Sequence, residues 1–281
     1  MPPRDRPTAR EARLGSELRK LREQANRTAT EAATHLRIDR AKISNIEAGY
    51  RGISPERLRS LAAFYGCDDQ PLLDALCAIA REQRGRHWWD SMRESVPQEA
   101  LDLAEMEHHA RHLHAVNMLL VPGILQIPEY ARAIFESRTP PFTSEEIEAR
   151  VKLRTNRRKI FEKQHPPIYE TIIHEAALRM RYGGRRVHEK QLRRLIEPKP
   201  GLPVTLRVIP FDLENVPGHA QSFLLSEGPV PQLNSVQVDT PFGGVIIHEA
   251  EEVKNYMAVL GNAKQNSLSP EESRKLIEKI I

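Results

Sequence analysis

The chain has 281 residues, 40% of them apolar, so it is long enough for two globular domains and is not expected to be disordered. No apolar run reaches the roughly 18 residues that a membrane helix needs, and the N-terminal stretch lacks the apolar segment of a secretory signal, so we expect a cytoplasmic protein without membrane contact. The two cysteines, Cys67 and Cys77, fit neither a disulfide framework nor a zinc knuckle and are expected to be reduced.

Charge is distributed unevenly within the net charge of +4. Residues 1–60 hold 14 basic and 8 acidic side chains, and residues 150–199 hold 15 basic and 5 acidic ones, whereas the stretches between and after these blocks are acidic. A basic N-terminal block suits contact with nucleic-acid phosphates, because neutralising phosphates releases their counterions.

The first part of the chain has the pattern of an all-α bundle. Residues 1–10 are expected to form a flexible tail, and residues 11–82 to fold as five short helices. Leu14, Leu18 and Leu21 recur at helical spacing along the first helix. Each of the other four begins at a polar N-cap residue or at a proline in its first turn. These start signals are Thr28 with Glu31, Asp39, Ser54–Pro55, and Asp68 or Asp69 with Pro71.

The segment DRAKISNIEAGYR, residues 39–51, has the pattern of a DNA recognition helix. When Ile43 and Ile46 face the core, the opposite surface carries the side chains that we predict to contact base edges in the major groove. These are Arg40, Ala41, Ser44 and Asn45. Arg40 suits guanine and Asn45 suits adenine, each contributing about 1–3 kcal/mol of base discrimination. The side chains predicted to hold phosphates are Thr28, Arg37, Lys42, Tyr50 and Arg51.

Residues 14–66 resemble the XRE-type, or lambda-repressor-like, helix-turn-helix family, whose third helix ends in Ile-Glu-x-Gly as RAKISNIEAG does. The chain departs from that family at Ala29, where glutamine is common. It departs again at Arg37, where glycine commonly separates the second and third helices, and this departure predicts a slightly rearranged turn. Because one helix reads only a few base pairs, we expect a homodimer on a short palindromic double-stranded DNA operator.

Residues 83–98, which include two tryptophans, are predicted to be a linker into a second domain spanning residues 99–281. Helical patterns cover residues 99–119, the stretch after VPGILQ, and residues 144–163, 185–197 and 248–262, and a last helix opens at Ser269–Pro270. Strand patterns are PPIYETIIHE, LPVTLRVIP, QSFLLS, NSVQVDT and GGVIIHE. The sequence therefore predicts an α+β domain with a sheet of about five strands.

Several stretches from about residue 85 to the end resemble, in order, the large C-terminal domain of WhiJ-like actinobacterial transcription regulators. They are HWWD, VPGILQIPEYARAI, EEIEARVKLRTNRRKIF, HEAALRMRYGG, QLRRLIE, VTLRVIPF and LSPEESRKLI. The resemblance implies a cytoplasmic regulator with a small acidic partner protein, and we expect control through this domain by such a partner or by a small-molecule effector. It also allows an alternative function, an antitoxin-like protein that neutralises a small partner and regulates its own expression.

Catalytic and metal-binding patterns are weak. Glu105, His109 and His112 are spaced to share one face of a helix, which suits a divalent ion, but we favour a solvated or inter-helix histidine cluster and predict no metal or cofactor. The pairs His174–Glu175 and His248–Glu249 do not form a His-Glu-x-x-His helix, and no nucleophile elbow or phosphate loop occurs. We therefore expect a protein that is not an enzyme.

The second basic block has three interpretations. Arg150, Arg154, Arg157 and Arg158 are predicted to lie along one side of a helix, which by default is a solvated face. Alternatively, Arg154, Arg157 and Arg158 could dock an acidic partner, since complementary charge raises the association rate and the specificity. The third interpretation is supplementary contact with the DNA backbone.

Overall fold

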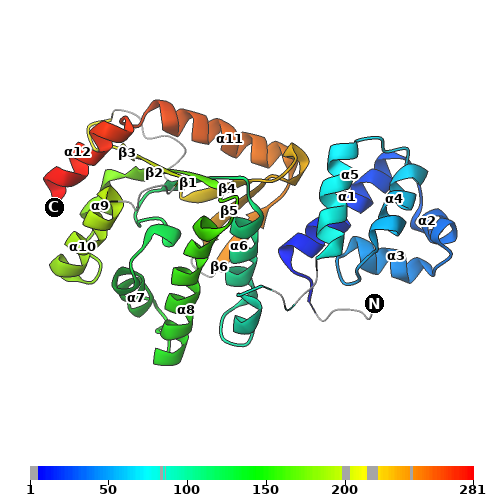
Figure 1. Ribbon diagram of the computed structural model, residues 1–281, viewed down its shortest axis with the longest axis horizontal. Helices are drawn as coiled ribbons and strands as arrows, with labels where there is room; N and C mark the ends of the chain where they lie inside the picture. The colour runs from blue at the N-terminus through cyan, green and yellow to red at the C-terminus, as the bar shows by residue number, and fades with distance from the viewer. Residues whose placement is uncertain (1–5, 83–84, 86, 198–202, 214–220, 241–242) are drawn as a thin grey trace. The chain divides into compact units, whose positions relative to one another are not determined.

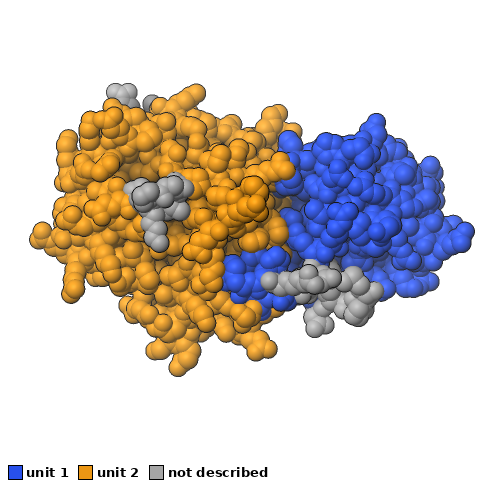
Figure 2. Space-filling view, in the orientation of Figure 1, with its two compact units in different colours: residues 1–90, 229–233 blue, residues 91–228, 234–281 orange. Residues whose placement is uncertain are grey.

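The computed structural model divides the chain into two compact units (Figures 1 and 2). It describes residues 6–82, 85, 87–197, 203–213, 221–240 and 243–281. The first unit comprises residues 1–90 with 229–233, and the second comprises residues 91–228 with 234–281. Among the described helices, none combines the length and the apolar character that crossing a membrane requires.

The first unit contains the predicted five helices. They are α1 (Ala9–Gln24), α2 (Ala29–Leu36), α3 (Arg40–Glu47), α4 (Pro55–Phe64) and α5 (Gln70–Arg81). The capping box of Thr28 with Glu31 opens α2 as predicted, and the side chains of Ser54 and Asp69 cap α4 and α5. Helix α1 begins inside the predicted tail, because Thr8 caps it. Residues 1–5 of that tail lie outside the described residues.

The core of this unit includes side chains from both of its chain segments. Leu18, Ile43 and Leu58 are buried in it, and Val230 and Leu233 from the second segment join the same apolar cluster. Polar contacts accompany this packing. The Arg13 guanidinium donates to the carbonyl oxygen of Gln232, and the Gln232 amide donates to Asp69 at 2.8 Å. The unit is therefore assembled from parts far apart in the sequence.

The second unit is built on a mixed sheet. Its described strands are β1 (His112–Asn117), β2 (Ile168–His174), β3 (Val204–Ile209), β4 (Phe223–Glu227), β5 (Ser235–Thr240) and β6 (Gly243–Ile247). Their order is β3-β2-β1-β4-β5-β6. The first three positions pair in parallel, and β1-β4-β5-β6 pair antiparallel. The predicted α+β class is confirmed.

The strand that the sequence prediction missed is β1, at the centre of the sheet. The helix expected over residues 99–119 is shorter: α6 (Gln98–His109) ends at His109, and the chain is extended from Ala110 onward. Leu113 and Ala115 are buried on one face of β1, and Val116 is buried on the other. A helix here would rotate these side chains away from both layers, so the packing favours the strand.

Helices cover both faces of the sheet. Besides α6, the described α-helices of this unit are α7 (Pro128–Glu136), α8 (Ser144–Asn156), α9 (Glu175–Arg179), α10 (Gly184–Ile196), α11 (Ala250–Gln265) and α12 (Pro270–Ile280). Helix α11 runs along one face, where Val253 and Ala263 pack against β1, β4 and β5 (Figure 1). The other face packs against α6, α9, α10 and α12. The predicted helix over 144–163 is α8 followed by a 3-10 helix over Arg157–Glu162.

Of the predicted linker, residues 83–84 and 86 lie outside the described residues. Its described remainder is not extended throughout, because Trp89 is buried and a 3-10 helix spans Asp90–Met92.

Candidate nucleic-acid interface

Helix α3 presents the predicted base-contacting side chains to solvent. Its inner face holds Ile43 and Ile46, which are 1% and 5% exposed. Arg40, Ala41 and Ser44 are exposed on the opposite side, and Asn45 is partly buried. Because successive helical residues turn by about 100°, these four side chains share one surface opposite the two isoleucines. The local geometry is that of a helix anchored from behind with a polar outer face.

Helix α1 fixes the C-terminal end of α3 by a close backbone approach. A Cβ atom added at Gly15 would lie 2.4 Å from the carbonyl oxygen of Glu47, so no side chain fits there. Arg22 of α1 also donates two hydrogen bonds to the Glu47 carboxylate, at 2.7 and 2.9 Å. These bonds raise the pKa of the Arg22 guanidinium above its ordinary value. The sequence analysis missed both contacts, because neither involves neighbours along the chain.

The turn between α2 and α3 keeps a left-handed residue although it lacks glycine. Arg37 has φ 53° and ψ 50°, and its N–H donates to the carbonyl oxygen of Thr34 at 3.1 Å. The N–H of Ile38 reaches back to the carbonyl oxygen of Ala33 at 3.0 Å, which completes a Schellman-type helix end. The predicted rearrangement of this turn is therefore wrong. Arg37 adopts the glycine-like conformation at some energetic cost, and its side chain is exposed.

The N-cap of α3 differs from the prediction. Asp39 occupies the cap position, but its carboxylate accepts no backbone hydrogen bond there. It pairs instead with the Lys42 ammonium at 2.9 Å, and this contact lowers the pKa of Asp39. Lys42 would have to leave Asp39 to hold a phosphate. The pair is exposed, so separating it costs little.

The other residues predicted to contact phosphates lie at the start of α2 and just after the end of α3. Thr28 is exposed at the start of α2, and Tyr50 is 41% exposed just beyond α3. Arg51 is partly buried, and its N–H donates to the carbonyl oxygen of Asn45 at 3.0 Å. Within the described part of the chain, the Arg37, Arg40 and Arg51 side chains form no ion pair, so their charges are available to an outside anion.

The arginines of the second basic block lie in a different environment. Arg157 is 7% exposed and binds the buried Glu107 carboxylate through two hydrogen bonds, at 2.7 and 2.5 Å. Helix α8 ends at Asn156, so Arg157 does not continue its surface. The prediction of a solvated helix face is wrong at this residue. The predicted docking set of Arg154, Arg157 and Arg158 cannot present Arg157 to a partner.

Arg154 and Arg158 hold the segment that contains VPGILQ. Arg154 donates to the Gln126 side-chain oxygen at 2.9 Å and lies over the Phe135 ring. Arg158 donates to the carbonyl oxygen of Ile124 at 3.0 Å and to that of Gln126. Burial and the neighbouring Arg157 lower the pKa of Arg154 to about 10. Both side chains therefore act mainly within the fold.

The three residues considered as metal ligands do not lie on one helix. Glu105 and His109 lie on α6, but His112 lies on β1, because the helix ends before it. The prediction that these three side chains share one face of a helix is therefore wrong. His112 instead lies near His114 of β1 and Glu227 of β4.

Two family models match the chain. Residues 13–76 match a helix-turn-helix domain, which agrees with the helical first unit. Residues 100–279 match a domain of unknown function (DUF5753), which covers more than half of the chain, and the protein therefore belongs to that family. No curated protein and no solved structure matches the chain. The XRE type and the WhiJ-like character remain predictions.

Proposed function

We propose that the protein is a sequence-specific DNA-binding transcription regulator of XRE type, whose α3 reads an operator. The observation that carries the proposal is the outer face of α3, where Arg40, Ala41, Ser44 and Asn45 stand opposite two buried isoleucines. Arginine and asparagine are the side chains that best match guanine and adenine edges. The exposed Arg37 and Tyr50 flank this face, as phosphate contacts should.

The proposed operator is a short palindrome bound by a homodimer. One recognition helix contacts only a few base pairs, so specificity over a genome needs a second helix about one DNA turn away. A two-fold pair of the first unit would supply it.

The proposed role of the second unit is control, with a WhiJ-like response to a partner protein or a small ligand. Such a signal must bind the DNA-competent and DNA-incompetent states with different affinities. The protein would thus act by binding and would need no catalytic residues, and its location would be the cytoplasm. The burial of Arg157 gives no support to an arginine docking face, so the partner surface of the antitoxin-like alternative is not assigned to it.

The test is selection of genomic DNA fragments by the purified full-length protein, followed by measurement of affinity for the recovered sequence and for a scrambled one. We expect a recurring palindromic motif and at least a 10³-fold preference over the scrambled sequence at physiological salt. Equal affinity for both sequences would contradict sequence-specific reading. A preference for the motif without a dimer in sedimentation would contradict only the proposed stoichiometry.

A further inference from the structure

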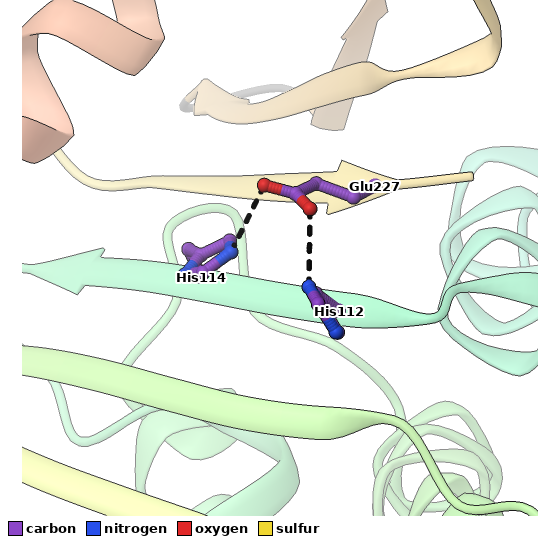
Figure 3. A group of neighbouring side chains, drawn as sticks. All are labelled: His112, His114 and Glu227. Carbon is purple, nitrogen blue, oxygen red and sulfur yellow. Dashed lines mark hydrogen bonds and ion pairs between the residues drawn. The ribbon is translucent and has the colours of Figure 1, made fainter. Parts of the chain in front are cut away.

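Three ionisable side chains from neighbouring strands converge on the face of the sheet that α11 covers. His112 and His114 are two residues apart on β1 and point to the same side, and Glu227 on β4 is the register partner of His112 (Figure 3). The cluster lies where β1 starts and β4 ends. The strand pairing therefore sets the spacing of these three groups, which belong to the rigid centre of the sheet.

Two distances in this cluster, one to each oxygen of the Glu227 carboxylate, are close to those between neighbouring ligand atoms of a metal. His112 Nδ1 lies 3.1 Å from Glu227 Oε2, and His114 Nε2 lies 3.2 Å from Glu227 Oε1. One ligand atom from each residue falls within 4.8 Å of the other two. In tetrahedral zinc sites, with bonds of about 2.0–2.2 Å, neighbouring ligand atoms are about 3.3–3.5 Å apart. Rotation of His112, which is 45% exposed, would close the widest gap.

Of the three residues, His114 has the environment that best suits cation binding. Both of its ring nitrogens are buried, and among the described residues neither has a partner in hydrogen-bonding geometry. Yet Nε2 faces the Glu227 carboxylate at 3.2 Å. In a hydrogen bond, the acceptor oxygen lies near the axis of the N–H bond. A tetrahedral metal would lie on that axis itself, and its next ligand atom would then lie well off the axis. The oxygen position thus suits a shared metal better than a shared proton.

A second carboxylate is placed to orient His114. Glu170 of β2 is the register partner of His114 on the other side, and its Oε2 lies 3.3 Å from His114 Nδ1. Lys264 of α11 binds the same carboxylate at 2.9 Å, so Glu170 already has a cationic partner. Histidine ligands commonly turn their second nitrogen toward such a carboxylate. With Lys264 offsetting Glu170, the charge of Glu227 remains to attract a divalent cation.

We propose that His112, His114 and Glu227 bind one divalent cation of the zinc class, with Glu170 as a positioning residue. Two imidazoles and one carboxylate are a ligand set that zinc accepts, and hard cations such as Mg²⁺ prefer oxygen ligands alone. The partial exposure of His112 and Glu227 leaves a coordination position for water or an incoming ligand. This site goes beyond the proposed DNA binding and does not depend on it.

The test measures Zn²⁺ binding to the full-length, tag-free, chelator-treated protein by calorimetry, with Mg²⁺ as a second titrant. We expect one equivalent of zinc and no comparable binding of magnesium. Glu227→Gln and His112→Ala should each weaken zinc binding by at least about 10–100-fold, and Glu170→Gln by about 10-fold. The matched control is His165→Ala, which removes an exposed histidine outside the cluster and should leave the affinity unchanged.

The variants are chosen so that folding does not confuse the result. Glu227→Gln keeps the shape of the side chain, and His112 is too exposed to be needed for the core. Melting in the presence of chelator should be the same for both variants and the wild type. Cobalt should give the visible absorption of a tetrahedral site in the wild type and lose it in Glu227→Gln. Zinc affinity unchanged in Glu227→Gln and His112→Ala, or weakened equally by His165→Ala, would overturn the proposal.

Discussion

Two sets of arginines in this protein come from basic stretches of sequence but lie in opposite environments. Arg37 and Arg40 of the first unit are exposed and form no ion pair with another described residue. Arg157 of the second unit is buried against Glu107, and Arg154 and Arg158 bind polar atoms of the segment around Gln126. A local excess of positive charge therefore does not identify a binding surface.

The difference lies in partners that are distant in the sequence. Glu107 precedes Arg157 by 50 positions and lies on α6, whereas among the described residues no carboxylate pairs with Arg37 or Arg40. A buried guanidinium is tolerated only when carboxylates or carbonyl oxygens satisfy its donors. The first set is thus available to an external anion, and the second set holds the fold together. Four sets of substitutions test this contrast.

The largest effect is expected for Arg157→Met. The change leaves the Glu107 carboxylate buried without its cation, which should lower the free energy of unfolding by about 3–5 kcal/mol. Urea denaturation of the full-length protein measures it. Lys152→Met, at an exposed position of α8, is the control and should change stability by less than about 0.5 kcal/mol. Equal stability of the two variants would contradict a structural role of the Arg157–Glu107 pair.

Gly15→Ala should have the next largest effect. The new methyl group would meet the carbonyl oxygens of Ile46 and Glu47, so α3 must shift, at a cost of about 1–3 kcal/mol. Operator affinity should fall together with stability, because the exposed arginines move with α3. Gly261→Ala on α11 is the control: the space around it is open, and alanine should stabilise the helix by about 0.5–1 kcal/mol. Unchanged stability of Gly15→Ala would refute the close approach of α1 and α3.

Arg40→Ala should weaken operator binding by about 1–3 kcal/mol and relax the base preference at one position. Lys42→Ala should instead weaken all sequences alike and reduce the salt dependence by about one phosphate contact. Competition binding to single-base operator variants at several salt concentrations separates the two. Arg185→Ala, at a highly exposed arginine of the second unit, is the control for loss of charge alone. A loss in Arg185→Ala as large as in Arg40→Ala would mean that charge, not position, governs binding.

The smallest effect is expected for Arg37→Gly. Glycine removes the strain of a left-handed side chain, so the free energy of unfolding should rise by about 1 kcal/mol. DNA affinity should fall slightly for every sequence if Arg37 holds a phosphate. Arg37→Ala keeps the strain and loses the charge, so thermal melting and DNA titration of the two variants separate these contributions. Stability that does not differ between them would show that the turn is not strained.

The parts of the fold that could be predicted have local causes. The helix starts of the first unit follow from side chains that bond backbone groups three positions later, as Thr28, Ser54 and Asp69 do. The strand β1 has a local signal too, because Leu113 and Ala115 alternate with His112 and His114. The residues just before β1 have helical spacing, so the local sequence also predicts that the preceding helix continues. Only burial on both faces of the sheet decides between the two patterns.

The candidate site could be predicted less completely than the fold. The outer face of α3 follows from periodicity, since Ile43 and Ile46 define the inner face. Two contacts depend instead on tertiary pairing. They are the Arg22–Glu47 hydrogen bonds that position α3 and the His112–Glu227 pair on the sheet. No pattern within one segment contains that information. A sequence can therefore indicate which side chains face outward before it indicates which ones meet.

The short segment 229–233 has a consequence for how the protein can be dissected. A fragment that stops near residue 90 would lack Val230 and Leu233, two members of the apolar cluster beneath the five helices. It would also lack the carbonyl oxygen of Gln232 that accepts from Arg13. Such a fragment should melt at a lower temperature than the same helices in the intact chain, and adding the missing pentapeptide in trans would restore little. Expression of residues 1–90 alone is thus a poor substitute for the whole molecule.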